Sequence, residues 1–145
     1  MKTRFSSLVS LKKNIVQKSE QLVQNANKVL RNAEKALEIS LEELHKIPSV
    51  EHGLIAEFLA TRMLLESQRA LIQHNQEWVA YAQKELLHVK EQLKYDMIEY
   101  EKFKYLELQE MQKVIKAQKI KEAKDLDEIA LMTFEKKTDK VREAS

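Results

Sequence analysis

The chain contains almost none of the residues that interrupt helices. It has one proline, Pro48, and one glycine, Gly53, among 145 residues, where average usage would supply about 17 of the two types together. It has no cysteine, which excludes disulfides and thiolate metal sites. With a single glycine, a glycine-rich loop that cradles a phosphate is excluded as well.

Long apolar runs are also missing. The longest, Trp78–Ala82, is five residues, whereas a membrane-spanning helix needs about 20. The first 19 residues carry no acid and several lysines, as a signal peptide would, but no apolar core follows them, so we expect no signal peptide. The formal net charge of +2 is too small to indicate nucleic-acid binding by itself.

What the chain does contain is typical of long helices. Ala, Glu, Lys, Leu and Arg supply 75 of the 145 residues, a composition characteristic of coiled coils. The off-centre Pro48 and Gly53 predict a turn at 47–53 between one helix of about 5–46 and another of about 54–140. Helices joined by so few residues lie antiparallel. We therefore expect a single all-α domain, 1–145, an antiparallel coiled-coil hairpin with a C-terminal helical overhang.

Heptad repeats predict which side chains form the seam, the face along which the two helices pack. In the first helix one line recurs every seven residues, and small residues form the second line. The first line is Ile15, Leu22, Val29 and Ala36, and the second is Ser19, Ala26, Ala33 and Ser40. The small side chains predict a close approach of the partner helix.

The second helix has a matching seam. Its apolar line is Leu65, Ile72, Val79, Leu86, Leu93 and Tyr100, and its interleaved line is Gln68, Asn75, Ala82 and Val89. Gln68 and Asn75 are polar at seam positions, a feature that usually weakens a coiled coil while fixing its register.

The unequal helices predict an uncovered C-terminal segment. A turn near residue 50 sets residue i opposite roughly 100 − i, so that Phe5 would meet Tyr95. Everything after about residue 96 would then lack cover within the chain. This segment carries apolar and aromatic side chains that indicate a contact surface for another protein: Tyr100, Phe103, Tyr105, Leu108 and Met111.

Two binding partners are compatible with that surface. One is a different protein, and the other is a second copy of the chain, whose overhang would pair with the overhang of the first. We expect a monomer, with the homodimer as the alternative. The lysine-rich stretch 113–124 is interpreted as a solvated helix face or a contact for an acidic surface. Nucleic acid is not expected, because no aromatic residues are interleaved with these lysines.

Catalytic and metal-binding constellations are not found in the sequence. The four histidines show no i,i+4 pair and no carboxylate at motif spacing, so we expect neither a metal nor a cofactor. A helical hairpin also lacks the concave pocket that catalysis generally needs. An enzyme is therefore not predicted.

Several stretches, in their order along the chain, resemble the flagellar export protein FliJ family. They are the basic opening "RFSSLVSLKKNIVQKSEQ", the break "PSVEHG", the segments "ALIQHNQEWV" and "YLELQEMQ", and the closing "AKDLDEIALMTFEKK". The last is the most specific, with a short Asp-Glu step, apolar residues and a basic end.

The resemblance implies a non-enzymatic stalk of the flagellar type III export apparatus, similar to the central stalk of rotary ATPases. The implied partners are the hexameric export ATPase FliI, the membrane export gate FlhA and export chaperones. The implied location is cytoplasmic, with membrane association only through partners. A stalk of a virulence secretion system and a self-associating scaffold stay open as alternatives.

The resemblance also implies binding residues. Those for the ATPase are Lys2, Arg4, Phe5, Lys12, Lys13, Asp127, Glu128, Ile129 and Met132. By position, Met63 and Leu64 are implied to contact the export gate, although "EFLATRMLLESQ" departs from the family in detail. The alternative for these two residues is packing against the first helix.

Overall fold

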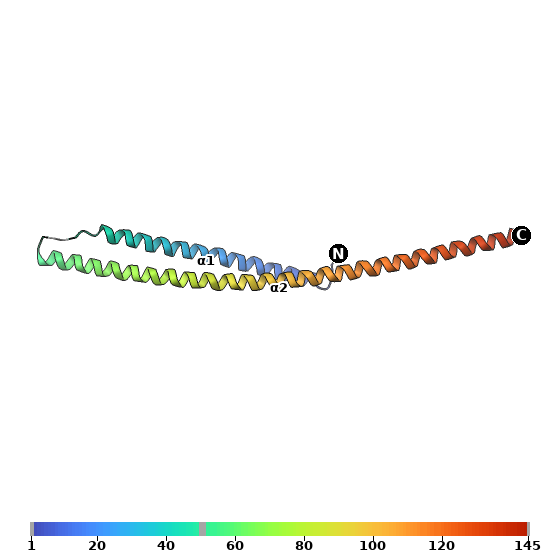
Figure 1. Ribbon diagram of the computed structural model, residues 1–145, viewed down its shortest axis with the longest axis horizontal. Coiled ribbons are helices and arrows are strands. Elements are labelled where there is room, and N and C mark those ends of the chain that lie inside the picture. The colour runs from blue at the N-terminus through green and yellow to red at the C-terminus, as the bar shows by residue number, and fades with distance from the viewer. Residues whose placement is uncertain (1, 50–51, 145) are drawn as a thin grey trace. The chain divides into compact units, whose positions relative to one another are not determined.

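The computed structural model describes residues 2–49 and 52–144 and contains two long helices, α1 (Ser6–Lys46) and α2 (Ile55–Ala144) (Figure 1). No strand occurs among the described residues. The two helices contact each other, which confirms the predicted all-α hairpin. Residues 50 and 51 of the predicted turn lie outside the described residues.

The chain divides into two compact units. The hairpin unit is Lys12–Glu99, in which residues 12–46 of α1 run antiparallel to residues 55–99 of α2 (Figure 1). The terminal unit combines Met1–Leu11 with Tyr100–Ser145.

A capping box starts α1. The Oγ1 of Thr3 accepts a hydrogen bond from the Phe5 N–H at 3.2 Å, and the Oγ of Ser6 accepts one from the Thr3 N–H at 2.8 Å. These bonds satisfy backbone donors that the first helical turn leaves unpaired. The chain therefore becomes helical within its first few residues.

The connection between the helices contains both interrupting residues. Pro48 follows the end of α1 at Lys46, as expected where proline disfavours helix at the residue before it. Gly53 has a positive φ of 157°, which glycine adopts more readily than other residues. The Leu54 carbonyl then accepts hydrogen bonds from the N–H groups of Glu57 and Phe58 at 2.9 and 3.2 Å and opens α2.

On α1 the packed face differs from the predicted one by a single position. The small line Ser19, Ala26, Ala33 and Ser40 is buried or half-buried. The apolar line beside it is Val16, Val23, Leu30, Leu37 and Leu44, all buried or half-buried. Leu22 and Val29, assigned to the seam from sequence, are instead 52% and 44% exposed, while Ile15 is half-buried.

The error on α1 has a simple cause. Apolar residues flank the small line on both sides, at positions 15, 22 and 29 and at positions 16, 23 and 30. Either flank completes a heptad pattern, so spacing alone does not distinguish them. The position of α2 determines which of the two flanks is buried.

On α2 the packed face lies where the heptads place it. Ile72 and Leu86 are buried, and Leu65, Val79 and Leu93 are half-buried. The second line, Gln68, Asn75, Ala82 and Val89, continues to Asp96, which is also buried.

Two polar layers cross this otherwise apolar seam. In one, Asn75 Nδ2 donates to Ser40 Oγ and to the Ala36 carbonyl, each at 3.2 Å, and Gln68 Nε2 donates to the Ser40 carbonyl at 2.8 Å. In the other, Ser19 Oγ donates to the Asp96 carboxylate. Among the described residues, no buried side-chain polar atom is left without a partner.

The register differs from the predicted one. The residue numbers of hydrogen-bonded pairs across the hairpin, such as Ser40–Asn75 and Gln68–Ser40, add to between 108 and 115. A residue i of α1 therefore lies opposite roughly 112 − i, not 100 − i. The end of α1 at Lys46 therefore lies opposite roughly residue 66, so the first turns of α2 have no residue of α1 opposite them. Residues 52–60 are all exposed.

The shift moves the limit of cover along α2. In the terminal unit, Arg4 Nε lies 3.6 Å from Glu110 Oε1, and half-buried positions on α2 end with Met111, apart from Thr138. The uncovered segment is therefore 112–142 and does not start at about residue 96. α1 ends at Lys46 and α2 begins at Ile55, so the difference from the prediction lies in the register: the first turns of α2 extend beyond the end of α1.

Candidate partner-binding sites

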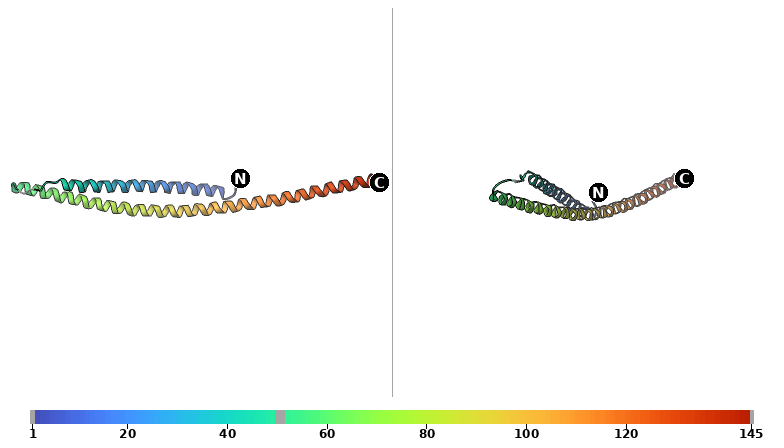
Figure 2. Two further views of the ribbon diagram at one scale, coloured as in Figure 1. Left: turned by 45° about the horizontal axis from the view of Figure 1, so that its top comes forward. Right: turned by 60° about the vertical axis from the view of Figure 1, so that its left-hand side comes forward.

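The start of α2 carries a group of exposed apolar side chains in the hairpin unit. We call it the turn-end patch, and it consists of Leu54, Ile55, Phe58, Leu59, Met63 and Leu64. Met63 and Leu64 are 70% and 51% exposed, so neither packs against α1. Met63 lies on the face of α2 away from the seam line that begins at Leu65. At this end of the hairpin unit α2 also extends beyond the end of α1 (Figure 2).

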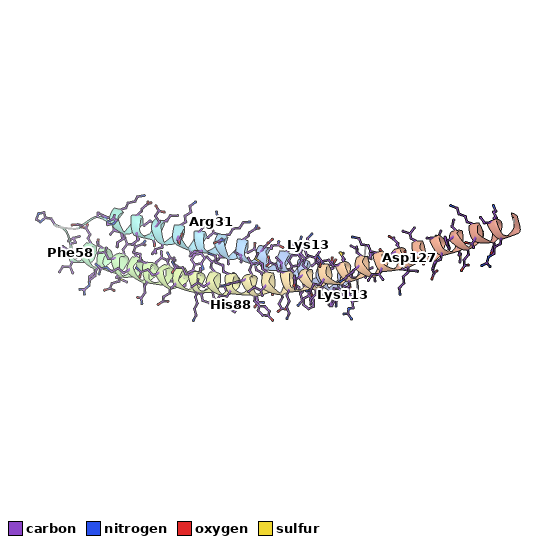
Figure 3. All side chains as sticks on the ribbon, turned by 45° about the vertical axis from the view of Figure 1, so that its right-hand side comes forward. Lys13, Arg31, Phe58, His88, Lys113 and Asp127 are labelled. Carbon is purple, nitrogen blue, oxygen red and sulfur yellow. The ribbon has the colours of Figure 1, made fainter. Side chains whose placement is uncertain are left out.

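A shallow groove of about 350 Å³ adjoins the turn-end patch. Ile47, Pro48 and Ser49 form one wall, and Phe58, Thr61 and Leu65 belong to the other. Phe58 is labelled at this end of the hairpin unit in Figure 3. The patch and the groove together offer apolar area beside a concave surface, which is the usual setting for a bound side chain.

The N-terminal basic start lies mostly in the terminal unit. Arg4 pairs with Glu110, and its guanidinium carbon lies 4.9 Å from the centre of the Phe5 ring. Lys2 is exposed. Lys12 and Lys13 belong to the hairpin unit, where Lys13 is exposed.

The predicted overhang surface is only partly open. Tyr100, Phe103 and Met111 are half-buried, whereas Tyr105 and Leu108 are exposed. A groove of about 390 Å³ runs along this part of α2 between Tyr100 and Met111. The prediction that all five residues are uncovered is wrong, because the register extends cover to Met111.

The uncovered segment, 112–142, is helical, and all of its residues except Thr138 are exposed. Around Asp127 no other described part of the terminal unit lies beside the helix (Figure 3). Apolar residues occur on two opposite faces of this segment at 100° per residue. The first stripe is Leu126, Ile129 and Met132, and the second stripe is Ala117, Ile120, Leu131 and Phe134.

Charges in the uncovered segment are sorted into blocks. Residues 113–124 hold five lysines and one glutamate, a net charge of +4. Residues 125–135 hold four acids and no base, a net charge of −4. Residues 136–142 carry a net positive charge.

The residues implied for ATPase binding do not form one compact patch. Lys2, Arg4 and Phe5 lie beside α2 near Glu110, whereas Asp127, Glu128, Ile129 and Met132 lie in the uncovered segment. At about 1.5 Å per residue, the nineteen positions from Glu110 to Ile129 correspond to roughly 28 Å along the helix. The structure therefore divides the set into separate surfaces.

The sequence interpretation omitted most of the turn-end patch. The available signal was the apolar spacing of Ile55, Phe58, Leu59 and Met63 directly after the glycine. Such spacing predicts a helix face. The structure shows that these side chains are exposed.

The described residues contain no group of three or more metal-ligating side chains that could hold a metal ion. Their helices also include no stretch both long enough and apolar enough to cross a membrane. The surfaces above are thus the candidate sites that the described residues present.

Comparisons with known proteins give one match. The family model described as "Flagellar FliJ protein" matches residues 1–139. No curated protein and no solved structure gives a significant match. The chain belongs to the FliJ family and is a component of flagellar type III protein export.

Proposed function

We propose that this protein acts as a stalk of the flagellar export apparatus that binds the hexameric ATPase FliI through its terminal unit. The uncovered segment is the observation that carries the proposal. Its first stripe, Leu126, Ile129 and Met132, is exposed on a part of α2 that no described part of the terminal unit covers. Contiguous exposed apolar side chains rimmed by charges commonly mark protein contacts.

The charges near this stripe support a specific contact. Asp127 and Glu128 lie within the acidic block, directly before Ile129. Lys2 and Arg4 present positive charge at the other end of the terminal unit. Two charged surfaces of opposite sign would orient the stalk and restrict it to a complementary partner.

The ATPase activity of FliI, measured with and without the protein, tests this proposal. We expect the full chain to stimulate hydrolysis, and a truncation after Lys124 to lose the stimulation. The double substitution Ile129→Ser and Met132→Ser should raise the half-maximal concentration at least tenfold, since apolar contact residues commonly contribute more than about 1.4 kcal/mol. Leu87→Ser, at an exposed site of the hairpin unit, is the matched control. Full stimulation by the truncated chain would refute the proposal.

We further propose that the turn-end patch binds the cytoplasmic part of the export gate FlhA. Met63 and Leu64 lie in this patch, and their exposure argues against the alternative of packing on α1. The adjoining groove at Pro48 and Phe58 offers a seat for an apolar side chain of the gate.

Substitution of the patch separates binding from folding. Met63→Ser with Leu64→Ser should weaken binding to the gate fragment about tenfold or more in calorimetry. The thermal midpoint should change little, because both side chains are exposed. Wild-type affinity of the double variant would contradict this assignment, and Leu87→Ser again provides the control.

Escort of export chaperones and a cytoplasmic location at the inner face of the membrane complete the proposed role. Both come from family membership, and we assign no residues to them. The matched family is flagellar, which favours that system over a virulence secretion system.

A further inference from the structure

We propose that the second stripe of the uncovered segment pairs antiparallel with the same stripe of a second copy of this chain. The ATPase proposal rests on the apolar residues of the first stripe and leaves the apolar residues of the second stripe unassigned. Ile120, Leu131 and Phe134 are exposed there, on the side of the helix away from Ile129. The proposal goes beyond the stalk function and does not depend on it.

The second stripe has coiled-coil spacing. Its positions alternate between steps of three and four residues, which is the pattern of a seam. The line is Ala117, Ile120, Lys124, Asp127, Leu131 and Phe134. The two charged positions lie in the middle, between apolar positions at either end.

This line is complementary to itself in the antiparallel direction. If residue i of one copy lies opposite 251 − i of the other, Ile120 meets Leu131 of the second copy and Ala117 meets its Phe134. Lys124 then meets Asp127 of the second copy, and the twofold axis produces each pair twice. The paired range, 113–138, begins after Met111, where the N-terminal cover ends.

Charge complementarity indicates a second copy as the occupant. In this register the block 113–124, with a net charge of +4, lies opposite residues 127–138 of the other copy, which hold three acids and two lysines, a net charge of −1. At the positions that border the seam, Lys121 lies beside Glu128 of the second copy. Lys116 lies beside Lys137 of the second copy, and this is the one like-charge pair among these positions. A parallel dimer would instead place each block against its own sign, which is destabilising.

Charge exchange provides the test, with the full chain and sedimentation velocity over a concentration series. The wild type should dimerise, and the dimer should weaken as salt is raised. The acidic variant, Lys121→Glu with Lys124→Glu, and the basic variant, Asp127→Lys with Glu128→Lys, should each dissociate about tenfold more readily, because four charge pairs reverse sign. An equimolar mixture of the two variants should recover a dimer.

The mixture also excludes a folding defect, since misfolded variants would not recover. A monomeric wild type at all concentrations would overturn the proposal, as would variants that dimerise like the wild type. Failure of the mixture to recover the dimer would overturn it too. The ATPase proposal is tested at Ile129 and Met132, which lie outside the second stripe, so its failure is distinguishable from failure of the dimer.

The lack of cysteine permits a second measurement of direction. Chains with Ile120→Cys mixed with chains carrying Leu131→Cys should form a disulfide between copies under mild oxidation. Ile120→Cys alone should not, because residue 120 of each copy would lie about 11 positions, or about 16 Å, from its counterpart. Crosslinking of Ile120→Cys chains to one another, without crosslinking in the mixture, would indicate a parallel pair and refute the proposed seam.

Discussion

The buried pair Ser19 and Asp96 offers the sharpest test of the hairpin register. Ser19 Oγ donates to one oxygen of the Asp96 carboxylate, and Gln92 Nε2 donates to the other at 3.1 Å. Both Ser19 and Asp96 are buried in the seam. Ser19→Ala removes the hydrogen bond that joins this carboxylate to Ser19 of α1.

The expected cost follows from the burial. A hydrogen bond to a charged group contributes about 1.5–3 kcal/mol, and a buried carboxylate oxygen that loses its donor regains little from water. We therefore expect Ser19→Ala to lower the free energy of unfolding by about 2 kcal/mol. In an Asp96→Ala background the same substitution should cost less than about 0.5 kcal/mol, since the carboxylate is already absent.

Urea unfolding followed by circular dichroism at 222 nm measures all four proteins of this double-mutant cycle. The coupling energy should be about 1.5 kcal/mol or more, well above the 0.3–0.5 kcal/mol by which independent sites depart from additivity. Ser67→Ala, at an exposed serine of α2, is the control and should change stability by less than about 0.5 kcal/mol. Additive effects of Ser19→Ala and Asp96→Ala would refute the register.

Two further predictions concern the same unit. Leu86→Ala should lower the free energy of unfolding by about 2–3 kcal/mol, because this side chain is only 8% exposed, whereas Leu87→Ala, at 63% exposed, should change it by less than about 0.5 kcal/mol. Equal losses in thermal melts would contradict the assigned face of α2. Cysteines replacing Ser40 and Asn75 should form an intramolecular disulfide, since these side chains are hydrogen bonded, whereas cysteines replacing Ser40 and Ala60 should not. Crosslinking of the second pair alone, on a non-reducing gel, would instead support a register in which residue i lies opposite roughly 100 − i.

Much of the fold could be predicted because helices depend on local properties. The scarcity of glycine and proline, together with strong helix formers, makes both helices and the position of their interruption evident. The seam of α2 could also be predicted, since only one apolar line, from Leu65 to Leu93, recurs at seven residues without a gap. On α1 two lines compete, and the prediction chose the one that contains Leu22 and Val29.

The candidate sites were harder to predict from the sequence, because each depends on which residues the other helix covers. Asp96 lies one heptad beyond Val89, so its seam position was readable, but its partner Ser19 was not. The partial burial of Tyr100 follows from the shift in register, whereas Met63 lies on the face of α2 away from the seam. The roles of Asp127, Glu128, Ile129 and Met132 in binding the ATPase stay predictions.

The sequence by itself determined that this chain forms two helices, that they are unequal, and that the longer one exceeds its cover. These properties follow from backbone propensity and periodicity, which act over a few residues. Only the tertiary structure decided the register, because it depends on side chains that meet across the seam: Ser19 with Asp96, and Ser40 with Asn75. Since an uncompensated buried carboxylate is costly, this pairing sets how far α1 reaches along α2, and thereby which surfaces are left for partners.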